Sequence, residues 1–166
     1  LSLAIGETAV IMLTEEDFEA ESKKKFSFKT EISDGFTFRK ETELSYGENG
    51  FENIRHYEKP VPVRLGDWAD IIGSDYSGSG VYEAVFTLPT EKIGKEGEIS
   101  LGDVRYAAEV YLNGCSLGTA LTPPYRLKIP CGILERKNKL KIVVTNTSAN
   151  WYIHTDYFNK WKAEEL

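Results

Sequence analysis

The sequence has few residues of the kinds that crosslink a chain or bind a structural metal. Its 166 residues include only 2 cysteines and 2 histidines. Two cysteines cannot form the disulfide framework of a small secreted domain, and Cys115 and Cys131 lack the close spacing of a metal site. A single Cys115–Cys131 bridge and two free thiols both fit the sequence, and we expect two free thiols.

Long apolar runs and an excess of positive charge are also missing. No stretch approaches the roughly 18 apolar residues of a membrane-spanning helix. The formal net charge of −6 argues against nucleic acid, which needs a basic surface, and against anionic membranes. We therefore expect neither as a partner. With 41% hydrophobic and 28% charged residues, the chain has the composition of one folded globular domain.

The clearest pattern that is present is apolar–polar alternation within residues 101–118, LGDVRYAAEVYLNGCSLG. A period of two places alternate side chains on one face of a strand. That face holds Val104, Tyr106, Ala108, Val110 and Leu112. Asn113-Gly114 then supplies the positive backbone angles of a type I′ turn, so residues 115–117 begin a return strand.

The same alternation, bounded by turn residues, predicts further strands. We expect them at residues 8–13, 26–32, 36–44, 82–88, 97–101, 125–129 and 140–144. The strands at 26–32 and 36–44 would pair across an Asp34-Gly35 turn. Many short strands separated by turn residues, without a long helix, are typical of a β-sandwich or barrel. We assign to its core three tyrosines that share a face with apolar residues, Tyr82, Tyr106 and Tyr125.

Two stretches lack alternation. Residues 46–80 are expected to form a long irregular connection. Its segment 73–80, GSDYSGSG, could act as a flexible linker, but Tyr76 and the nearby Trp68 favour a packed loop. Residues 146–166 are dense in aromatic side chains: Trp151, Tyr152, Tyr157, Phe158 and Trp161. These rings either fold back onto the sandwich or form a platform for a flat ligand, and packing is the reading we expect.

Four segments together resemble a known family: residues 77–89, 101–118, 123–130 and 138–146. They are similar to the jelly-roll, galactose-binding-like sugar-binding domain of glycoside hydrolases of the family 2 beta-galactosidase and alpha-L-rhamnosidase types. The matching positions are Gly102, Asp103, Val104, Ala108, Val110, Asn113, Gly114, Gly118, Asn138, Leu140, Val144 and Asn146. The resemblance covers about residues 68–161.

The resemblance implies an all-β fold, a jelly-roll antiparallel β-sandwich with long loops and an aromatic C-terminal tail. Residues 1–166 would form a single domain, with 61–166 as the family-like core and 1–60 as extra N-terminal strands. Because the sequence begins at Leu1 without an initiator methionine, we expect a fragment of something longer or a processed product, and the resemblance makes the longer protein a glycoside hydrolase.

The implied function is that of a non-catalytic accessory or sugar-binding domain. In the related enzymes the catalytic carboxylates lie in a separate barrel of about 250 residues, which cannot fit here. No loop aspartate forms an acid–base motif among Asp67, Asp70, Asp75, Asp103 and Asp156. The expected partners are a carbohydrate and the catalytic domain of the parent enzyme. A stand-alone carbohydrate-binding module, a purely structural interaction domain and a small stand-alone hydrolase remain as alternatives.

A bound sugar would stack on an aromatic ring while polar side chains take its hydroxyl groups. The candidates are residues expected in loops: Trp68, Tyr76, Trp151, Tyr152 and His154. His154 could instead bind a metal or act as a base, but no second ligand cluster accompanies it and His56 is isolated.

We expect no cofactor and no metal. Calcium is common in domains that look like this one, but no run of oxygen ligands identifies a Ca²⁺ site. The resemblance favours a secreted or periplasmic bacterial enzyme, whereas two free cysteines point the other way.

Overall fold

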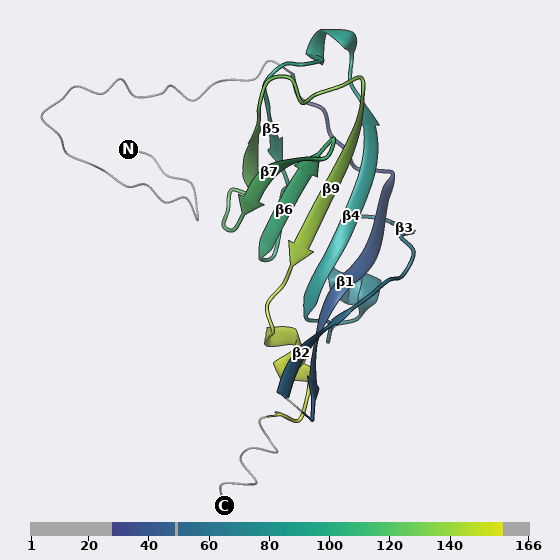
Figure 1. The fold of residues 1–166 in the computed structure, drawn as a ribbon, viewed down its shortest axis with the longest axis vertical. Coiled ribbons are helices and arrows are strands. Elements are labelled where there is room, and N and C mark those ends of the chain that lie inside the picture. The colour runs from purple at the N-terminus through teal and green to yellow at the C-terminus, as the bar shows by residue number, and fades with distance from the viewer. Residues whose placement is uncertain (1–27, 49, 158–166) are drawn as a thin grey trace, which may run out of the picture.

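The computed structural model describes residues 28–48 and 50–157, which form an all-β domain (Figure 1). Its strands are β1 (Phe36–Gly47), β2 (Gly50–Arg55), β3 (Val61–Val63), β4 (Gly78–Thr87), β5 (Gly97–Ser100), β6 (Ala107–Leu112), β7 (Cys115–Ala120), β8 (Arg126–Ile129) and β9 (Lys137–Thr145). Its short helices are α1 (Trp68–Ile72), α2 (Ala149–His154) and the 3₁₀ turn η1 (Thr90–Lys92). Within these ranges, no helix is long and apolar enough to cross a membrane.

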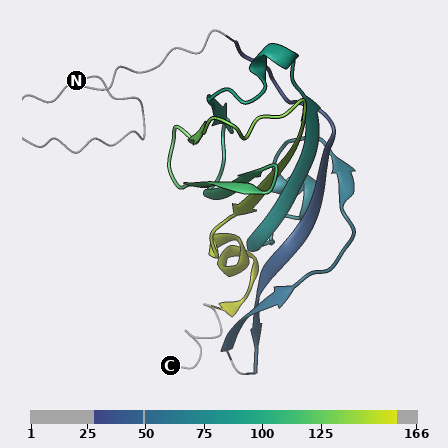
Figure 2. The same ribbon diagram turned by 45° about the horizontal axis from the view of Figure 1, so that its top comes forward.

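The strands form two antiparallel sheets. The larger sheet has the order β2-β1-β4-β9-β6-β7, and β3 pairs with β1 beside β2. The smaller sheet consists of β5 and β8. In Figure 2, the long strands β1 and β4 curve along one side of the domain, and the green strands that follow them in the chain lie towards the concave side of this curve. The predicted all-β jelly-roll sandwich is confirmed.

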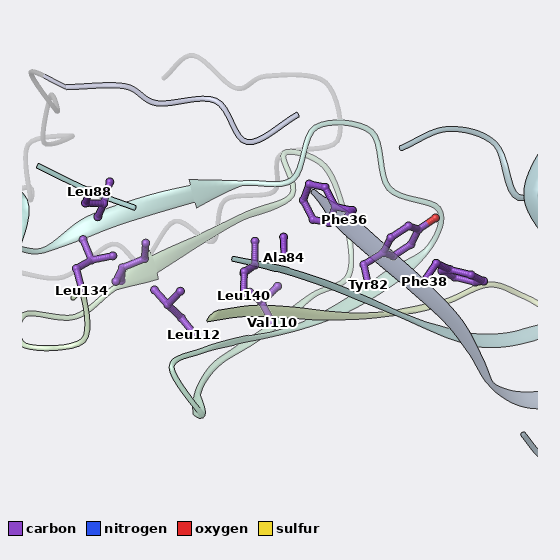
Figure 3. Packing of buried hydrophobic residues seen from close by; sticks show 10 residues of the cluster. Phe36, Phe38, Tyr82, Ala84, Leu88, Val110, Leu112, Leu134 and Leu140 are labelled. Carbon is purple, nitrogen blue, oxygen red and sulfur yellow. The ribbon is translucent and has the colours of Figure 1, made fainter. Parts of the chain in front are cut away.

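The hydrophobic core joins side chains of the larger sheet to β8 and the segment after it. Its buried members are Phe36, Phe38, Tyr82, Ala84, Leu88, Val110, Leu112, Ile129, Leu134 and Leu140. Figure 3 shows aliphatic side chains such as Leu88, Leu112 and Leu134 at one end of this cluster, and Phe36, Tyr82 and Phe38 at the other. Alternation therefore predicted the inward face of β4, β6, β8 and β9 correctly, because one face of each strand is covered.

Tyr106 is the exception to the predicted core tyrosines. Tyr82 and Tyr125 are buried, but Tyr106 is 52% exposed. The pairing of β6 with β9 begins with Ala107 opposite Thr145, the last residue of β9. Tyr106 precedes this pair, and β9 has already ended at Thr145. The apolar–polar alternation in the sequence therefore extends one residue further than the strand pairing, and the Tyr106 side chain is left exposed.

Two other sequence predictions are wrong. Residues 28–32 form no strand, and both edges of β1 are occupied by other strands, β4 on one side and β2 with β3 on the other. The region 46–80 is not irregular, since it contains β2, β3, α1 and the start of β4. For segment 73–80 the expected packing through Trp68 and Tyr76 is confirmed, because Tyr76 and Ser77 are buried and the rings of Trp68 and Tyr76 are in contact. The predicted strand at 8–13, together with Phe26, lies outside the described residues.

Two asparagines fix the central hairpin to β9. Asn138 is fully buried, and its Oδ1 accepts hydrogen bonds from Asn113 Nδ2 and from the Glu135 N–H, each at 2.9 Å. Its Nδ2 donates to the Glu135 carbonyl at 2.6 Å. The Asn113 Oδ1 in turn accepts from the Lys139 N–H at 2.8 Å. Asn113, at φ 52°, and Gly114 form the predicted turn, so the turn is held in place by side-chain amides as well as by its backbone angles.

A further joint connects β1 and β4 through Tyr76, which is 2% exposed. Its hydroxyl lies 2.7 Å from the carbonyl oxygens of Thr42 and Ser79 and can donate to either. Burial raises the pKa of this hydroxyl, and the nearby Glu43 carboxylate raises it further. The protonated phenol therefore joins the two strands beside Gly78, where an added side chain would overlap the Thr42 carbonyl.

We expect Asn138→Ala to lower the free energy of unfolding by about 2–4 kcal/mol, because it removes a fully buried amide that bonds Asn113 Nδ2 and both backbone groups of Glu135. Urea denaturation would measure this as a lower midpoint. The matched control is Asn53→Ala, at an exposed position of β2, which should change stability by less than about 0.5 kcal/mol. Equal effects of the two substitutions would contradict a structural role for the Asn113–Asn138 pair.

We expect Tyr76→Phe to cost about 1 kcal/mol at neutral pH through the lost hydrogen bond. Because the folded pKa is raised, the unfolded chain loses the phenolic proton first as the pH passes about 10. The stability that Tyr76 provides is therefore complete below that pH and declines above it, by up to about 1.4 kcal/mol per pH unit. Denaturation of both proteins at pH 8, 10 and 11 would show their difference shrinking. Tyr57→Phe, at an 85% exposed position, should show no such trend.

Candidate functional site

The five predicted ligand residues fall into two groups. Trp68 and Tyr76 contact each other, with ring centroids 5.5 Å apart. Trp68 also packs against Phe38 at 5.8 Å, and its indole N–H donates to the Tyr82 hydroxyl at 2.9 Å. The rings and polar atoms of these two residues therefore contact other residues of the sandwich. Tyr76 exposes almost no surface on which a sugar could stack.

Trp151, Tyr152 and His154 lie together on α2, which follows β9. The tail is tied to the start of β4 by side-chain hydrogen bonds. Asn146 Oδ1 accepts from the Gly78 N–H at 2.7 Å, and its Nδ2 donates to the Tyr76 carbonyl at 2.8 Å. The Ser77 hydroxyl accepts from the Trp151 N–H at 2.8 Å. These bonds place α2 beside the β1–β2 hairpin, which extends beyond the end of β9 (Figure 1).

Aromatic rings fill the contact between the hairpin and the tail. Tyr46 and Phe51 of the hairpin face each other at 5.0 Å between centroids. Phe51 lies 5.3 Å from Trp151, and Tyr46 lies 5.2 Å from Tyr157. Edge-to-face contacts of this kind stabilise a junction beyond the area that they bury. The described part of the tail is thus packed against the domain, as expected, while Phe158 and Trp161 lie outside the described residues.

A pocket of about 240 Å³ opens next to this cluster. We call it the junction pocket, because its walls come from β1, β2, the loop before β4, and α2 with the residue after it. Its lining residues are Glu43, Leu44, Ser45, Ile54, Asp75, Trp151, His154 and Thr155. Of the predicted ligand residues, the structure brings Trp151 and His154 to this pocket. Tyr152 packs beside it, 5.3 Å from the Trp151 ring.

Two carboxylates, those of Glu43 and Asp75, lie in the lining of the junction pocket. The Glu43 carboxylate lies 2.7 Å from His56 Nε2 and 3.8 Å from Lys40 Nζ. The Nδ1 of His56 lies 3.7 Å from a carboxylate oxygen of Glu58. Asp75 and His154 are exposed at the mouth. The site therefore combines an indole wall with two carboxylates that can accept hydrogen bonds from hydroxyl groups.

Thr155 adds an unusual feature to the pocket wall. Its hydroxyl oxygen is the one buried side-chain polar atom without a hydrogen-bond partner in residues 28–48 and 50–157. Buried polar atoms nearly always have a partner, from the protein, water or a ligand. Thr155 belongs to the pocket lining, but its hydroxyl oxygen is enclosed by protein atoms.

Sequence reasoning missed the half of the pocket that comes from β1 and β2. Glu43, Ser45 and Ile54 belong to strands that pair within a hairpin, whereas residues after 46 were expected to be irregular. The alternation of residues 50–55 is weak, since most of β2 is exposed. Only the turn residue Gly50 and the aromatic pair of Tyr46 and Phe51 signal this hairpin in the sequence.

A second, more open hollow of about 490 Å³ lies along β3 and α1, lined among others by Val61, Leu65 and Asp70. It contains none of the predicted ligand residues. Within the described ranges, no group of three or more His, Cys, Asp or Glu side chains could hold a metal. Cys115 and Cys131 are both free and exposed, so of the two alternatives the structure has the free thiols.

Comparison with known proteins places this fold among glycoside hydrolases. No protein-family model matches the chain. A candidate beta-glucuronidase from Formosa agariphila is 35% identical over 77 residues, which is 45% of this chain. The chain spans only 7% of that protein's length.

Two solved structures share the fold. A beta-glucuronidase from Ruminococcus gnavus, in complex with a C6-substituted uronic isofagomine, matches with a TM-score of 0.52 and 18% identity. The match covers 74% of this chain and 23% of that enzyme. A beta-glucuronidase from Bifidobacterium dentium, complexed with coumarin-3-O-glucuronide, has a TM-score of 0.50 and 22% identity, over 70% of this chain and 21% of that enzyme.

At these identities the solved structures share the fold with this chain. The chain spans less than a quarter of each of them, and an even smaller part of the Formosa protein. The resemblance noted in the sequence is thereby confirmed: this β-sandwich has the fold of a small part of glycoside hydrolases.

Proposed function

We propose that this chain is a non-catalytic accessory domain of a glycoside hydrolase, and that its junction pocket holds a sugar residue. The observation that carries the proposal is the lining of that pocket. Trp151 offers an aromatic face for the C–H groups of a pyranose, and the carboxylates of Glu43 and Asp75 can accept its hydroxyl protons.

The accessory role is supported by size and by the use of the motif residues. The relatives are far longer than this chain, and a catalytic barrel of about 250 residues would have to lie outside it. Asn113, Asn138 and Asn146, which carry the family resemblance, bind backbone or one another. Such residues maintain a scaffold, so ligand recognition falls to the pocket beside it.

A second candidate function is a docking surface for the catalytic domain of the parent enzyme. The observation that favours it is the exposure of apolar side chains on the hairpin and α2: Tyr46, Phe51 and Ile54 are 44–50% exposed, and Ile153 is 74% exposed. Exposed apolar residues that gather at one end of a domain often mark a protein interface. The two functions are separable, because sugar binding needs only the isolated chain.

Titration of the full chain with methyl glycosides, followed by NMR of the indole N–H signals, tests sugar binding. The chain has 3 tryptophans, and we expect the Trp151 signal to shift with a saturable, millimolar response. The Trp68 signal serves as an internal control, because its N–H is bound to Tyr82 inside the domain. A Trp151 signal that stays fixed at high sugar concentration would contradict sugar binding and leave the docking surface.

We expect Trp151→Ala to weaken binding about ten-fold through the lost stacking surface. Because Trp151 also packs against the hairpin, His154→Ala is the second variant. His154 is exposed, so its loss should leave the fold intact and weaken binding about three-fold by removing one hydrogen bond. Tyr57→Ala, at an 85% exposed position outside the pocket, is the matched control and should bind as the wild type does.

A further inference from the structure

The charges around the junction pocket are unevenly distributed. Its lining carries two carboxylates, Glu43 and Asp75, and none of the described lining residues is lysine or arginine. His154 is the sole basic side chain in the lining and lies exposed at the mouth. A charged ligand would therefore meet carboxylates from two walls of the site, one on β1 and one on the loop before β4.

Further charged side chains lie around Glu43, on β1 and on the chain that follows β2. Glu41 and Glu58 flank Glu43, and all three carboxylates act to raise the pKa of the neighbouring Tyr76 hydroxyl. Lys40 and Arg39 each lie within 4 Å of one of these carboxylates, and Arg55 lies on β2 opposite Thr42. These cations offset part of the negative charge beside the pocket, so what distinguishes the lining itself is the pair of carboxylates, Glu43 and Asp75, without a lining lysine or arginine.

Resting on the proposed function, we infer that the junction pocket binds neutral and amino sugars and rejects uronic acids. A neutral pyranose satisfies the carboxylates through its hydroxyl groups and stacks on Trp151. An ammonium group in place of one hydroxyl gains a charge-assisted hydrogen bond. A uronate instead brings its own carboxylate towards Glu43 and Asp75, where like charges repel and no lining lysine or arginine compensates for them.

Three methyl glycosides of nearly equal size test this inference: methyl β-D-glucopyranoside, methyl β-D-glucuronide and methyl β-D-glucosaminide. The full chain is titrated with each at low and at high sodium chloride, with the Trp151 indole signal as the readout. We expect the glucuronide to bind at least about five-fold more weakly than the glucoside at low salt, and the glucosaminide about two-fold more tightly. Both differences should shrink in high salt, because screening acts on charge.

Asp75→Asn is the variant that isolates the charge, since it keeps the shape of the side chain at an exposed position. We expect it to reduce the preference for glucoside over glucuronide at least two-fold. The matched control is Asp34→Asn, at an exposed position before β1 and at the far end of that strand from Glu43. This control should leave the preference unchanged.

The outcomes separate this inference from the proposed function. Shifts at Trp151 that are equal for glucuronide and glucoside, or stronger for the glucuronide, would overturn the charge selectivity while sugar binding stands. A preference that does not change with salt or with Asp75→Asn would also overturn it, because selection would then depend on shape. The absence of a response to all three glycosides would refute sugar binding itself.

Discussion

The side chain of Asn146 holds together the parts on which the candidate site depends. Asn146 comes directly after β9. Its side chain accepts a hydrogen bond from the Gly78 N–H and donates one to the Tyr76 carbonyl. Ser77 then binds the first turn of α2 through the Trp151 N–H. The pairing of β4 with β9 thus supports the junction pocket, because these hydrogen bonds fix α2 within a few residues of the end of β9.

Much of the fold follows from local sequence pattern. Alternation predicts the buried faces of β4, β6, β8 and β9, and Asn113-Gly114 predicts the central turn, because each of these features depends on neighbouring residues alone. The family motif points to the same strands. The structure gives the asparagines of this motif a physical role: Asn138 is fully buried, and Asn113 and Asn138 bond each other and the surrounding backbone.

The remaining features depend on contacts between segments far apart in the sequence. Tyr106 continues an alternating pattern but passes the end of its partner strand, so it is exposed. The residues before β1 look like a strand, yet both edges of β1 are already paired. In the site, the tail residues Trp151 and His154 could be found from the sequence because aromatic density marks them. Glu43 and Ile54 could not, because only the pairing of β1 with β2 brings them to the same pocket.

The walls of the junction pocket come from opposite ends of the described chain. Glu43 lies on β1 and Thr155 follows α2, and β4 and β9 must pair between them before these walls can meet. Contacts of such long sequence separation form only after the loops that connect them have closed. Occupation of the pocket is therefore linked to the global unfolding of the sheet rather than to the ordering of one loop. A bound ligand would therefore raise the free energy of unfolding of β1, β4 and β9 together.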